Sequence, residues 1–392
     1  MTVPIGIHDI SMATGQYAMD LAELARRNDV DVNKYYIGLG QTTQTVPAAD
    51  EDIVTMAAAA AKQIVAKHGV DGIRTVLFAT ESGIDQSKSA AIYVQDLIGL
   101  SSATRAVELK QACYGGTSAL QLAAGIVARD PEQRVLVIAS DIAKYDVDSS
   151  GESTQGAAAV AMLISANPNL AVIDETVGLY TAHVQDFWRP NYRSTPLVDG
   201  GLSVRAYLEA VEQAWKDYES RGGRSVTEFA GFCYHQPFTK MAYKAHTRLL
   251  ELKGIDATEA RLYADLSPTT IYNRAIGNSY TASLFVGLMS LLDHAEDLDG
   301  RSVALFSYGS GCVAELFSLT MVDGYREHLR TVENRAAIAH REPITYEKYR
   351  ALREFALPED GSDVTLDATS RSPFRLTSIS GHSRIYEASH AR

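Results

Sequence analysis

Cys113 is the residue of this sequence whose type and setting best suit covalent chemistry. It lies in QACYGGTSAL, where two glycines and small residues follow the thiol and a helical pattern begins at once. At a helix start, unpaired backbone N–H groups and the positive end of the helix dipole lower the pKa of a thiol. The glycines would also let a substrate carbonyl approach the backbone. The alternative is a buried cysteine beside Gly115 and Gly116 that serve only close packing, and the local pattern leaves both open.

Four other polar residues stand at the ends of predicted elements. Glu81 ends the apolar run RTVLFAT, where burial would raise a carboxylate pKa toward that of a general base. His235 ends FAGFCYH and could protonate or polarise a carbonyl that becomes an alkoxide. Asn278 in GNSYT and Ser310 in SYGSG are flanked by glycines and could orient a developing oxyanion. Each residue alone also fits a structural role.

A basic segment follows His235. Lys240, Lys244 and Arg248 are spaced by four, so a helix places all three on one face. No Asp or Glu occurs from Phe229 to Leu250, although the chain as a whole is acidic. The pattern fits a phosphate-binding patch, and it fits an ordinary solvated helix face equally well.

The elements that must position these residues follow the alternating pattern of an α/β protein. Short runs rich in β-branched residues predict buried strands at Arg74–Thr80, Arg134–Ser140, Phe229–His235 and Ser302–Gly309. Longer periodic segments predict helices over Ile53–Gly69, Cys113–Arg129 and Ser279–Ala295.

A faint internal repeat relates two parts of the chain. RTVLFATES, CYGGTSALQLAAG and RVLVIASD resemble FAGFCYHQP, GNSYTASLFVG and SVALFSYGSG in the same order. The repeat places the candidate polar residues at strand ends and helix starts, where α/β folds gather ligand chemistry. From about Leu357 the chain is polar and rich in turn residues, and we expect a surface loop there rather than a domain.

Composition excludes several classes of protein. The 392 residues carry a net charge of −12 and are 46% hydrophobic, so neither disorder nor non-specific attraction to nucleic acid or anionic membranes is expected. The N-terminus lacks a signal-peptide pattern and no apolar run reaches membrane-spanning length, so we expect a cytoplasmic protein. Three cysteines without CxxC spacing favour neither disulfides nor a zinc site.

With Glu81, Cys113 and His235 in this order, the sequence closely resembles the 3-hydroxy-3-methylglutaryl-CoA synthases of the mevalonate pathway, bacterial type. The likeness runs nearly from end to end. The matching motifs are KYYIGLGQ, ATES, ELKQACYGGTSAL, ASDIA, QGAAAVAML, DFWRPNY, LVDGGLS, YHQPFTKMAYKAH, IGNSYTASL and FSYGSG.

The resemblance implies a thiolase-like αβαβα fold built from two halves, 1–170 and 171–392, in a homodimer. It implies that Cys113 takes the acetyl group of acetyl-CoA and that Glu81 removes a proton from the acetyl methyl. The carbanion then attacks the ketone of acetoacetyl-CoA with His235 as the acid, and water releases the product. No metal or redox cofactor is implied, and neither nucleic acid nor membrane is an expected partner.

The resemblance also assigns two further sets of residues. The family's substrate contacts fall on Asp31, Ser150, Thr154, Ser203, Lys240, Lys244, Asn278 and Ser310. Positions that support the site in the family are Tyr114, Asp141 and Asp186.

Three rival functions share part of this pattern. A synthase of the same fold acting on carrier-protein-bound acetoacetyl groups in polyketide β-branching would use the whole catalytic set. A decarboxylating or priming ketoacyl-carrier-protein synthase would need no carboxylate base, so Glu81 argues against it. A non-catalytic acyl-CoA-binding protein would have no use for the nucleophile Cys113.

Overall fold

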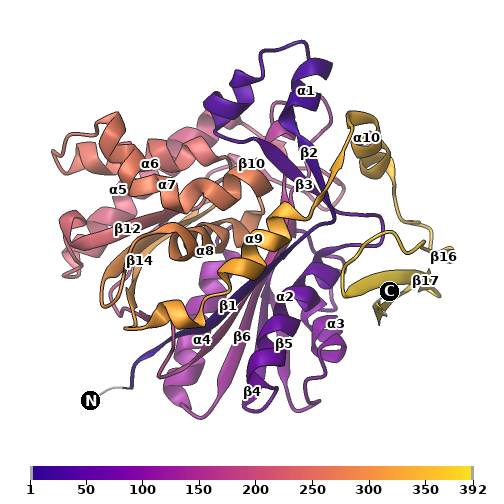
Figure 1. Ribbon diagram of the computed structural model, residues 1–392, viewed down its shortest axis with the longest axis horizontal. Coiled ribbons are helices and arrows are strands. Elements are labelled where there is room, and N and C mark those ends of the chain that lie inside the picture. The colour runs from indigo at the N-terminus through magenta and orange to yellow at the C-terminus, as the bar shows by residue number, and fades with distance from the viewer. Residues whose placement is uncertain (1–2, 390–392) are drawn as a thin grey trace.

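A ten-stranded mixed β-sheet organises the computed structural model, which describes residues 3–389. Its order is β12-β13-β14-β8-β1-β7-β6-β4-β5, with β9 paired to β14 (Figure 1). The strands of this sheet are β1 (Ile5–Thr14), β4 (Ile73–Ala79), β5 (Arg105–Leu109), β6 (Arg134–Ile142), β7 (Ala157–Ala166), β8 (Ala171–Ile173), β9 (Gly178–Thr181), β12 (Phe229–Tyr234), β13 (Ser302–Gly309) and β14 (Val313–Met321).

The pairing pattern of the sheet occurs twice. In one half β4 and β6 are parallel, and β6, β7 and β1 then pair antiparallel. In the other half β12 and β13 are parallel, and β13, β14 and β8 then pair antiparallel. The two halves join where β1 pairs with β8. Glu81 therefore follows β4 as His235 follows β12, which confirms the repeat expected from the sequence.

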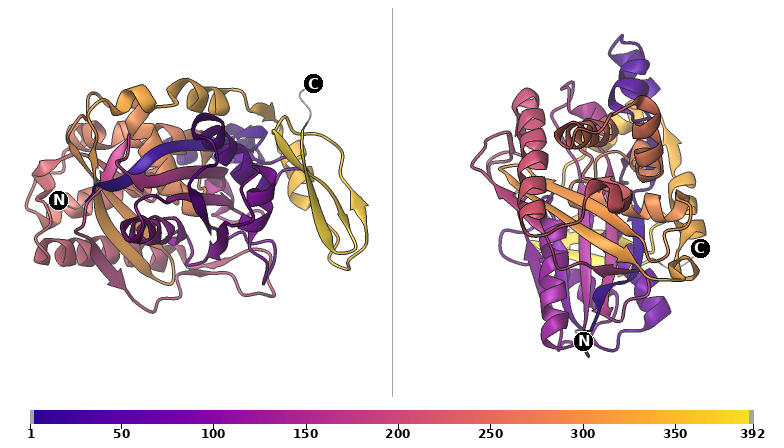
Figure 2. Two further views of the ribbon diagram at one scale, coloured as in Figure 1. Left: turned by 90° about the horizontal axis from the view of Figure 1, so that it is seen from below. Right: turned by 90° about the vertical axis from the view of Figure 1, so that its left-hand side faces the viewer.

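Helices cover both outer faces of the sheet and fill the space between its halves (Figures 1 and 2). Alternate residues of β6 explain the layering, because Val135 and Val137 join the core around α4 and α8, whereas Leu136 and Ile138 pack with α2. On the other half, α5 and α6 cover the outer face. The result is the expected αβαβα arrangement. The helices are α2 (Ile53–His68), α3 (Ala90–Leu97), α4 (Gly115–Arg129), α5 (Gly200–Ser220), α6 (Thr239–Leu252), α7 (Glu259–Ile276), α8 (Ser283–His294) and α9 (Thr331–Ala339).

A smaller lobe, which we call the α10 lobe, combines residues 17–46 with residues 342–354 at the top of Figure 1. Its hydrophobic core includes Tyr35 and Leu24 from the first segment, and Ile344, Tyr346 and Tyr349 from the second. Its elements are β2 (Tyr17–Asp20), α1 (Leu21–Arg27), the π-helix η1 (Lys34–Leu39), β3 (Thr43–Val46), β15 (Glu342–Ile344) and α10 (Tyr346–Glu354).

Short elements complete the chain. Two short strands pair antiparallel in a separate two-stranded sheet, and several single turns of 3₁₀-helix precede strands or helices. These elements are η2 (Glu152–Thr154), β10 (Phe187–Trp188), β11 (Leu197–Val198), η3 (Val226–Glu228), η4 (Tyr280–Ala282) and η5 (Tyr325–His328).

The predicted strands and helices are confirmed to within a few residues, but the prediction for the C-terminal tail is wrong. The tail forms a three-stranded antiparallel sheet of β16 (Val364–Thr365), β17 (Phe374–Ser380) and β18 (Ser383–Ala388), drawn in yellow in Figure 2. Phe374 and Leu376 are buried, and the buried carboxylate of Asp50 accepts hydrogen bonds from Thr369 and Ser370. Turn residues obscured this short apolar alternation.

Over residues 3–389, no helix combines the length and apolar character needed to cross a membrane. The same residues contain no group of three or more His, Cys, Asp or Glu side chains placed to hold a metal ion.

Candidate active site

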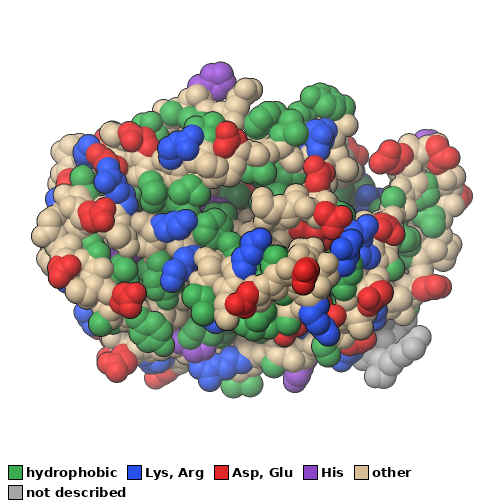
Figure 3. Space-filling view, turned by 90° about the horizontal axis from the view of Figure 1, so that it is seen from above, with side chains coloured by type: hydrophobic (Ala, Val, Ile, Leu, Met, Phe, Trp, Pro, Cys, Tyr) green, Lys and Arg blue, Asp and Glu red, His purple; other side chains and the backbone are tan. Residues whose placement is uncertain are grey.

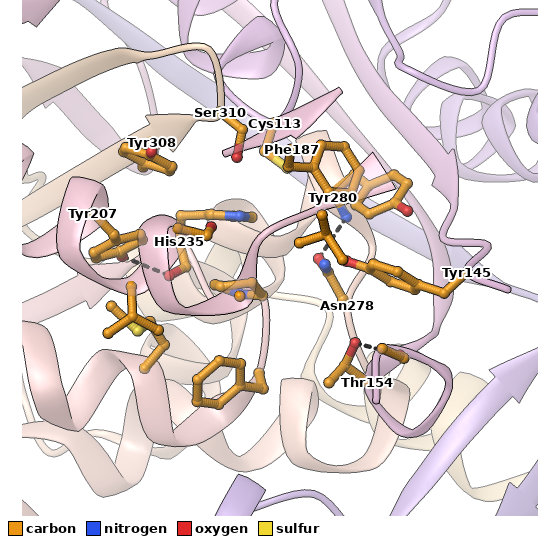
Figure 4. Close-up of a pocket in the computed structure, with 18 of the residues that line it drawn as sticks. Cys113, Tyr145, Thr154, Phe187, Tyr207, His235, Asn278, Tyr280, Tyr308 and Ser310 are labelled. Carbon is orange, nitrogen blue, oxygen red and sulfur yellow. Dashed lines mark hydrogen bonds between the residues drawn. The ribbon is translucent and has the colours of Figure 1, made fainter. Parts of the chain in front are cut away.

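A cavity of about 190 Å³ gathers most of the residues singled out from the sequence. It opens between the two halves, near the ends of β12 and β13 and the start of α4. Figure 4 shows Cys113 and Ser310 at one end, His235 and Tyr207 on one side, and Asn278 and Tyr280 on the other. The predicted residues that line it are Cys113, Ser150, Thr154, Ser203, His235, Asn278 and Ser310.

Cys113 lies directly before α4 and contacts Glu81. Its Sγ donates to Glu81 Oε1 over 2.9 Å. The preceding residue, Ala112, has a φ of 44°, a left-handed conformation that is uncommon for alanine and clusters at functional sites. The sharp turn it creates projects the thiol into the cavity at the N-terminal end of the helix.

The expectation of a lowered thiol pKa at Cys113 is wrong for this arrangement. Burial and the neighbouring Glu81 carboxylate raise the pKa of Cys113 well above its ordinary value, and outweigh the helix N-terminus. Without a substrate, the cysteine is therefore a neutral thiol that is hydrogen-bonded to the Glu81 carboxyl group. Activation of the nucleophile requires that the thiol proton leaves during acyl transfer.

Gly116, the second glycine after Cys113, fits the packing alternative rather than substrate approach. A Cβ on Gly116 would lie 2.7 Å from Phe285 Cε2 and 2.8 Å from the carbonyl oxygen of Thr281, so this glycine permits α4 to approach α8 and η4. Gly115 is also buried against Ala79 and Thr281. Close packing of the two central helices fixes the thiol between the halves of the molecule.

Glu81 is held at the end of β4 by a buried carboxylate. Oδ1 of Asp141 accepts from the backbone N–H groups of Glu81 and Ser82, each at 2.9 Å, and from the Thr80 hydroxyl at 2.8 Å. On the other side, Arg189 donates to the Glu81 carbonyl oxygen at 2.6 Å. Burial, followed by the charge of Asp141, raises the pKa of Glu81 to about 8. A carboxyl group with this pKa can accept a proton near neutral pH.

Backbone hydrogen bonds hold His235 in place, and its imidazole ring lines the cavity. Its N–H donates to the carbonyl oxygen of Phe306 at 2.9 Å, and its own carbonyl accepts from the Tyr207 hydroxyl at 2.7 Å. Within residues 3–389, Nδ1 has no hydrogen-bond partner. Burial lowers the pKa of His235 to about 3, so the imidazole is neutral at physiological pH and can donate through one N–H.

Asn278 couples two walls of the cavity. Its backbone N–H donates to the Thr154 carbonyl at 2.9 Å, and its side-chain oxygen accepts from the N–H of Tyr280 at 2.9 Å. The amide NH₂ group therefore remains as a donor for a ligand oxygen. Ser310 lies at the Cys113 end of the cavity, and its carbonyl accepts from Gln111 Nε2 at 3.2 Å.

Sequence reasoning missed the aromatic character of this cavity. Tyr145, Phe187 and Tyr280 form a cluster of edge-to-face rings in which Cys113 also packs. Tyr207 and Tyr308 line the opposite side (Figure 4). Phe187, Tyr280 and Tyr308 lie inside motifs already noted, DFWRPNY, IGNSYTASL and FSYGSG, which could have revealed them. No local pattern identified the other two.

A larger cleft of about 1,070 Å³ lies beside the cavity, between η1 and helices α6 and α7. The two share a boundary, because Leu39 and Met241 line the cavity, whereas Gly40 and Lys240 line the cleft. Figure 3 views the molecule from above, where the surface is hollowed and Lys and Arg side chains lie among apolar and acidic ones around the hollow. The cationic residues of the cleft are Arg205, Lys240, Lys244, Arg248 and Arg274.

The predicted basic face is divided between two roles. Arg248 forms an ion pair with Glu212 on α5. Lys240 and Lys244 instead lie over the rings of Tyr243 and Phe238, with no carboxylate partner among the described residues. These two lysines therefore remain available to an anionic ligand.

The predicted supporting residues lie behind the cavity. The Tyr114 hydroxyl donates to buried Glu315 at 2.7 Å. Asp186 accepts from the Tyr308 hydroxyl at 2.8 Å and from the N–H of Gly311 at 3.0 Å, which holds the Ser310 loop. Together with Asp141, they fix the loops that carry the site.

Asp31 is the predicted contact that the structure does not bring to either cavity. Its carboxylate is exposed and accepts from the backbone N–H of Asn33 at 2.9 Å, so it stabilises the turn before η1. It is absent from the residues that line the cavity and the cleft.

Comparison with known proteins gives consistent matches along the chain. The N-terminal model of hydroxymethylglutaryl-coenzyme A synthase matches residues 2–169, and the C-terminal model matches residues 171–253 and 250–356. The hydroxymethylglutaryl-CoA synthase of Enterococcus faecalis is 40% identical over 386 residues, which cover 97% of this chain and 99% of the relative.

Solved structures agree with these matches. An HMG-CoA synthase complexed with CoA is 38% identical with a TM-score of 0.93, over 98% of this chain and 100% of the other. MvaS in complex with 3-hydroxy-3-methylglutaryl coenzyme A is 35% identical with a TM-score of 0.91, over 100% of both chains. A polyketide biosynthesis 3-hydroxy-3-methylglutaryl-ACP synthase from Bacillus subtilis is 31% identical, over 89% of this chain and 88% of the relative. The chain therefore belongs to the hydroxymethylglutaryl-CoA synthase family.

Proposed function

We propose that this enzyme condenses acetyl-CoA with acetoacetyl-CoA and water to form HMG-CoA and CoA, through an acetyl thioester on Cys113. The observation that carries the proposal is the contact between the Cys113 thiol and the Glu81 carboxyl group, at the end of a cavity that His235 and Asn278 also line. A nucleophile, a base and carbonyl-binding groups are the parts that such a condensation needs.

The first step is acetyl transfer. Cys113 Sγ attacks the thioester carbonyl of acetyl-CoA, a carbon–sulfur bond forms at the enzyme, and the bond to the CoA sulfur breaks. The thiol proton goes to the departing CoA thiolate, so the step leaves acetyl-Cys113 and free CoA and does not change the protonation of Glu81.

The second step is carbon–carbon bond formation. Glu81 removes a proton from the methyl group of acetyl-Cys113, and the carbanion attacks the ketone carbon of acetoacetyl-CoA. A group with a pKa of about 8 suits this role, because it is a stronger base than an ordinary carboxylate. The ketone oxygen becomes an alkoxide and takes the N–H proton of neutral His235, and the proton that Glu81 removed returns to the imidazole ring. Water then hydrolyses the thioester: its hydroxyl stays on the acyl carbon and its second proton goes to the departing Cys113 sulfur, which releases HMG-CoA.

The cleft supports CoA thioesters as substrates. Lys240 and Lys244 lie over aromatic rings without carboxylate partners among residues 3–389, and their charges suit phosphate groups. The shared boundary at Leu39 and Met241 would let a flexible thiol arm pass from the cleft to Cys113. Ser150, Thr154 and Ser203 would contact the arm or the acyl group, with Asn278 and Ser310 near the reacting carbonyls.

The enzyme would act as a homodimer in the cytoplasm and need no metal or redox cofactor. Edge strand β5 and its neighbours expose Ile92, Val107 and Leu122, three apolar side chains that a partner subunit could cover. Gel filtration coupled to light scattering tests the dimer, and cell fractionation tests the location.

The decisive experiment separates the two chemical steps. Incubation with radiolabelled acetyl-CoA should leave acid-stable, hydroxylamine-labile label on the wild type and none on Cys113→Ala. Glu81→Ala should still accept label but fail to condense it with acetoacetyl-CoA. Label that persists on the Cys113 variant, or normal condensation by the Glu81 variant, would overturn the corresponding role.

One rival has support from the comparisons, since a relative from Bacillus subtilis is named as an ACP synthase. The same assay distinguishes the two acceptors when free acetoacetyl-CoA is replaced by acetoacetyl carrier protein. The large cleft, which five Lys and Arg and three Glu side chains line, favours the nucleotide-bearing acceptor. Exclusive turnover of the carrier-bound acceptor would reverse this choice.

A further inference from the structure

Helix α10 contacts the cavity wall through a buried hydrogen-bond network that the proposed chemistry does not use. The wall segment, residues 144–156, contributes Tyr145, Ser150, Gly151 and Thr154 to the cavity. Tyr349 of α10 is only 1% exposed and packs in the core of the α10 lobe. Its ring thus belongs to the lobe, whereas its hydroxyl points to the wall segment.

The Tyr349 hydroxyl joins two side chains of the wall segment. It donates to Glu152 Oε1 at 2.9 Å and accepts from Gln155 Nε2 at 2.8 Å. Both partners are buried, at 1% and 4% exposure, so water cannot replace the hydroxyl without a rearrangement. The contact links residues almost two hundred positions apart in the chain.

The partners of Tyr349 in turn hold the cavity wall. Gln155 Oε1 accepts from the N–H of Tyr145 at 2.7 Å, and Glu152 Oε2 accepts from the N–H of Asp148 at 2.8 Å. Gln155 also forms a parallel β-bridge with Asn278. The Tyr349 hydroxyl is therefore connected, through the hydrogen bonds of Glu152 and Gln155, to both ends of the wall segment and to Asn278 on the facing wall.

A second contact from α10 reaches the same segment independently. Arg353 Nη2 donates to the carbonyl oxygen of Tyr145 at 2.7 Å. The ring of Tyr145 packs with Tyr280 and Cys113 at the reacting end of the cavity. Because Tyr349 and Arg353 lie one turn apart on one helix, α10 holds the wall at two points.

We propose that Tyr349, with Arg353, is a positioning residue that sets the shape of the acyl cavity by holding the segment 144–156 in place. The inference rests on the proposed function, in which Ser150 and Thr154 of that segment contact the arm or the acyl group of the substrate. Loss of the hydroxyl should loosen the wall and weaken acceptor binding, while the chemistry at Cys113 remains intact.

The test compares Tyr349→Phe with Tyr346→Phe. Tyr346 lies on the same helix and in the same hydrophobic core, but its hydroxyl accepts from Arg350 and does not contact the wall segment. Each variant is titrated with labelled acetyl-CoA, so that kcat is expressed per acetylated Cys113. Hydrogen exchange then reports the backbone of 144–156 directly.

For Tyr349→Phe we expect the KM for acetoacetyl-CoA to rise roughly 3- to 10-fold, the effect of one typical hydrogen bond, with kcat per labelled Cys113 changed less than about twofold. Amides of 144–156 should exchange faster, and those of β6 should not. Tyr346→Phe should match the wild type. Arg353→Met, which removes the second contact and keeps the stem, should shift KM in the same direction.

Two results would overturn the inference. One is an unchanged KM and unchanged exchange in both Tyr349→Phe and Arg353→Met. The other is a loss of labelled fraction with an unchanged KM, which would indicate only a structural role. Failure of the proposed function itself looks different, because the wild type would then produce no HMG-CoA.

Discussion

Replacement of Asp141 by asparagine should affect both the stability of the fold and the pKa of Glu81, and the two effects can be measured separately. Asp141 is fully buried and accepts five hydrogen bonds, three at Oδ1 from residues 80–82 and two at Oδ2 from Thr281. Burial raises the pKa of Asp141, and the donors oppose that rise because they favour the carboxylate. Asparagine keeps the shape but removes the charge and one acceptor.

The cost in stability follows from the donors. The amide can keep its oxygen on the three donors of residues 80–82 and direct its NH₂ group at the Thr281 hydroxyl, which leaves the Thr281 N–H without an acceptor. One orphaned buried N–H costs about 1–3 kcal/mol, and weaker neutral bonds in place of charged ones add about 1 kcal/mol. We therefore expect Asp141→Asn to lose about 2–4 kcal/mol in urea unfolding.

The effect on catalysis has a definite sign. The Asp141 charge is the second cause, after burial, of the raised Glu81 pKa of about 8, so its removal should lower that pKa. For each unit by which the pKa of Glu81 falls, the ionised fraction of Glu81 rises about tenfold at any pH well below that pKa. The acid limb of the condensation rate, measured by single turnover of pre-acetylated enzyme, should move to lower pH.

Asp50→Asn is the matched control. Asp50 is also fully buried and accepts from the backbone and hydroxyls of Thr369 and Ser370, but it holds the C-terminal sheet and not Glu81. It should lose similar stability and keep the wild-type pH profile. An acid limb that stays in place or moves upward in Asp141→Asn, or that moves equally in Asp50→Asn, would refute the reasoning.

Four other predictions follow from the same contacts. The double variant Lys240→Ala and Lys244→Ala should raise the KM for acetyl-CoA about 3- to 10-fold, and the increase should depend on salt. The KM for a short acetyl thioester without a nucleotide should not change, and steady-state kinetics measures both values. Gly116→Ala should destabilise the fold by about 1–3 kcal/mol in urea unfolding, because its Cβ would clash with Phe285. Burial lowers the His235 pKa from 6.5 to about 3, so stability should fall as pH decreases from about 6.5, and His235→Gln should flatten that dependence in thermal unfolding. Prolonged dialysis against a chelator should leave kcat unchanged.

Residue patterns predicted the framework of this protein well. Strand ends and helix starts were visible in the sequence because both faces of β4, β6, β12 and β13 are buried, which gives continuous apolar runs that end at polar residues. Glu81 and His235 were found at such ends and Cys113 at a helix start, and the family motifs grouped them. Asp31 was placed by resemblance alone, and the structure leaves it outside both cavities.

Other features depended on contacts between distant segments. The C-terminal sheet needs Asp50 as its acceptor, and Tyr349 reaches Gln155 across the chain. A local pattern carries no information about such partners, because nothing in the flanking residues specifies them. The aromatic wall of Tyr145 and Tyr207 was hidden for the same reason.

The sequence alone determined which residue types are available for the chemistry and the elements that carry them, since both depend on local order and periodicity. Only the tertiary structure decided their protonation. A helix start predicts a lowered thiol pKa at Cys113, yet the folded chain brings Glu81 within 2.9 Å and partly buries the sulfur, which raises that pKa. Electrostatic interactions act through space, so the state of the thiol is set by the neighbour that the fold supplies.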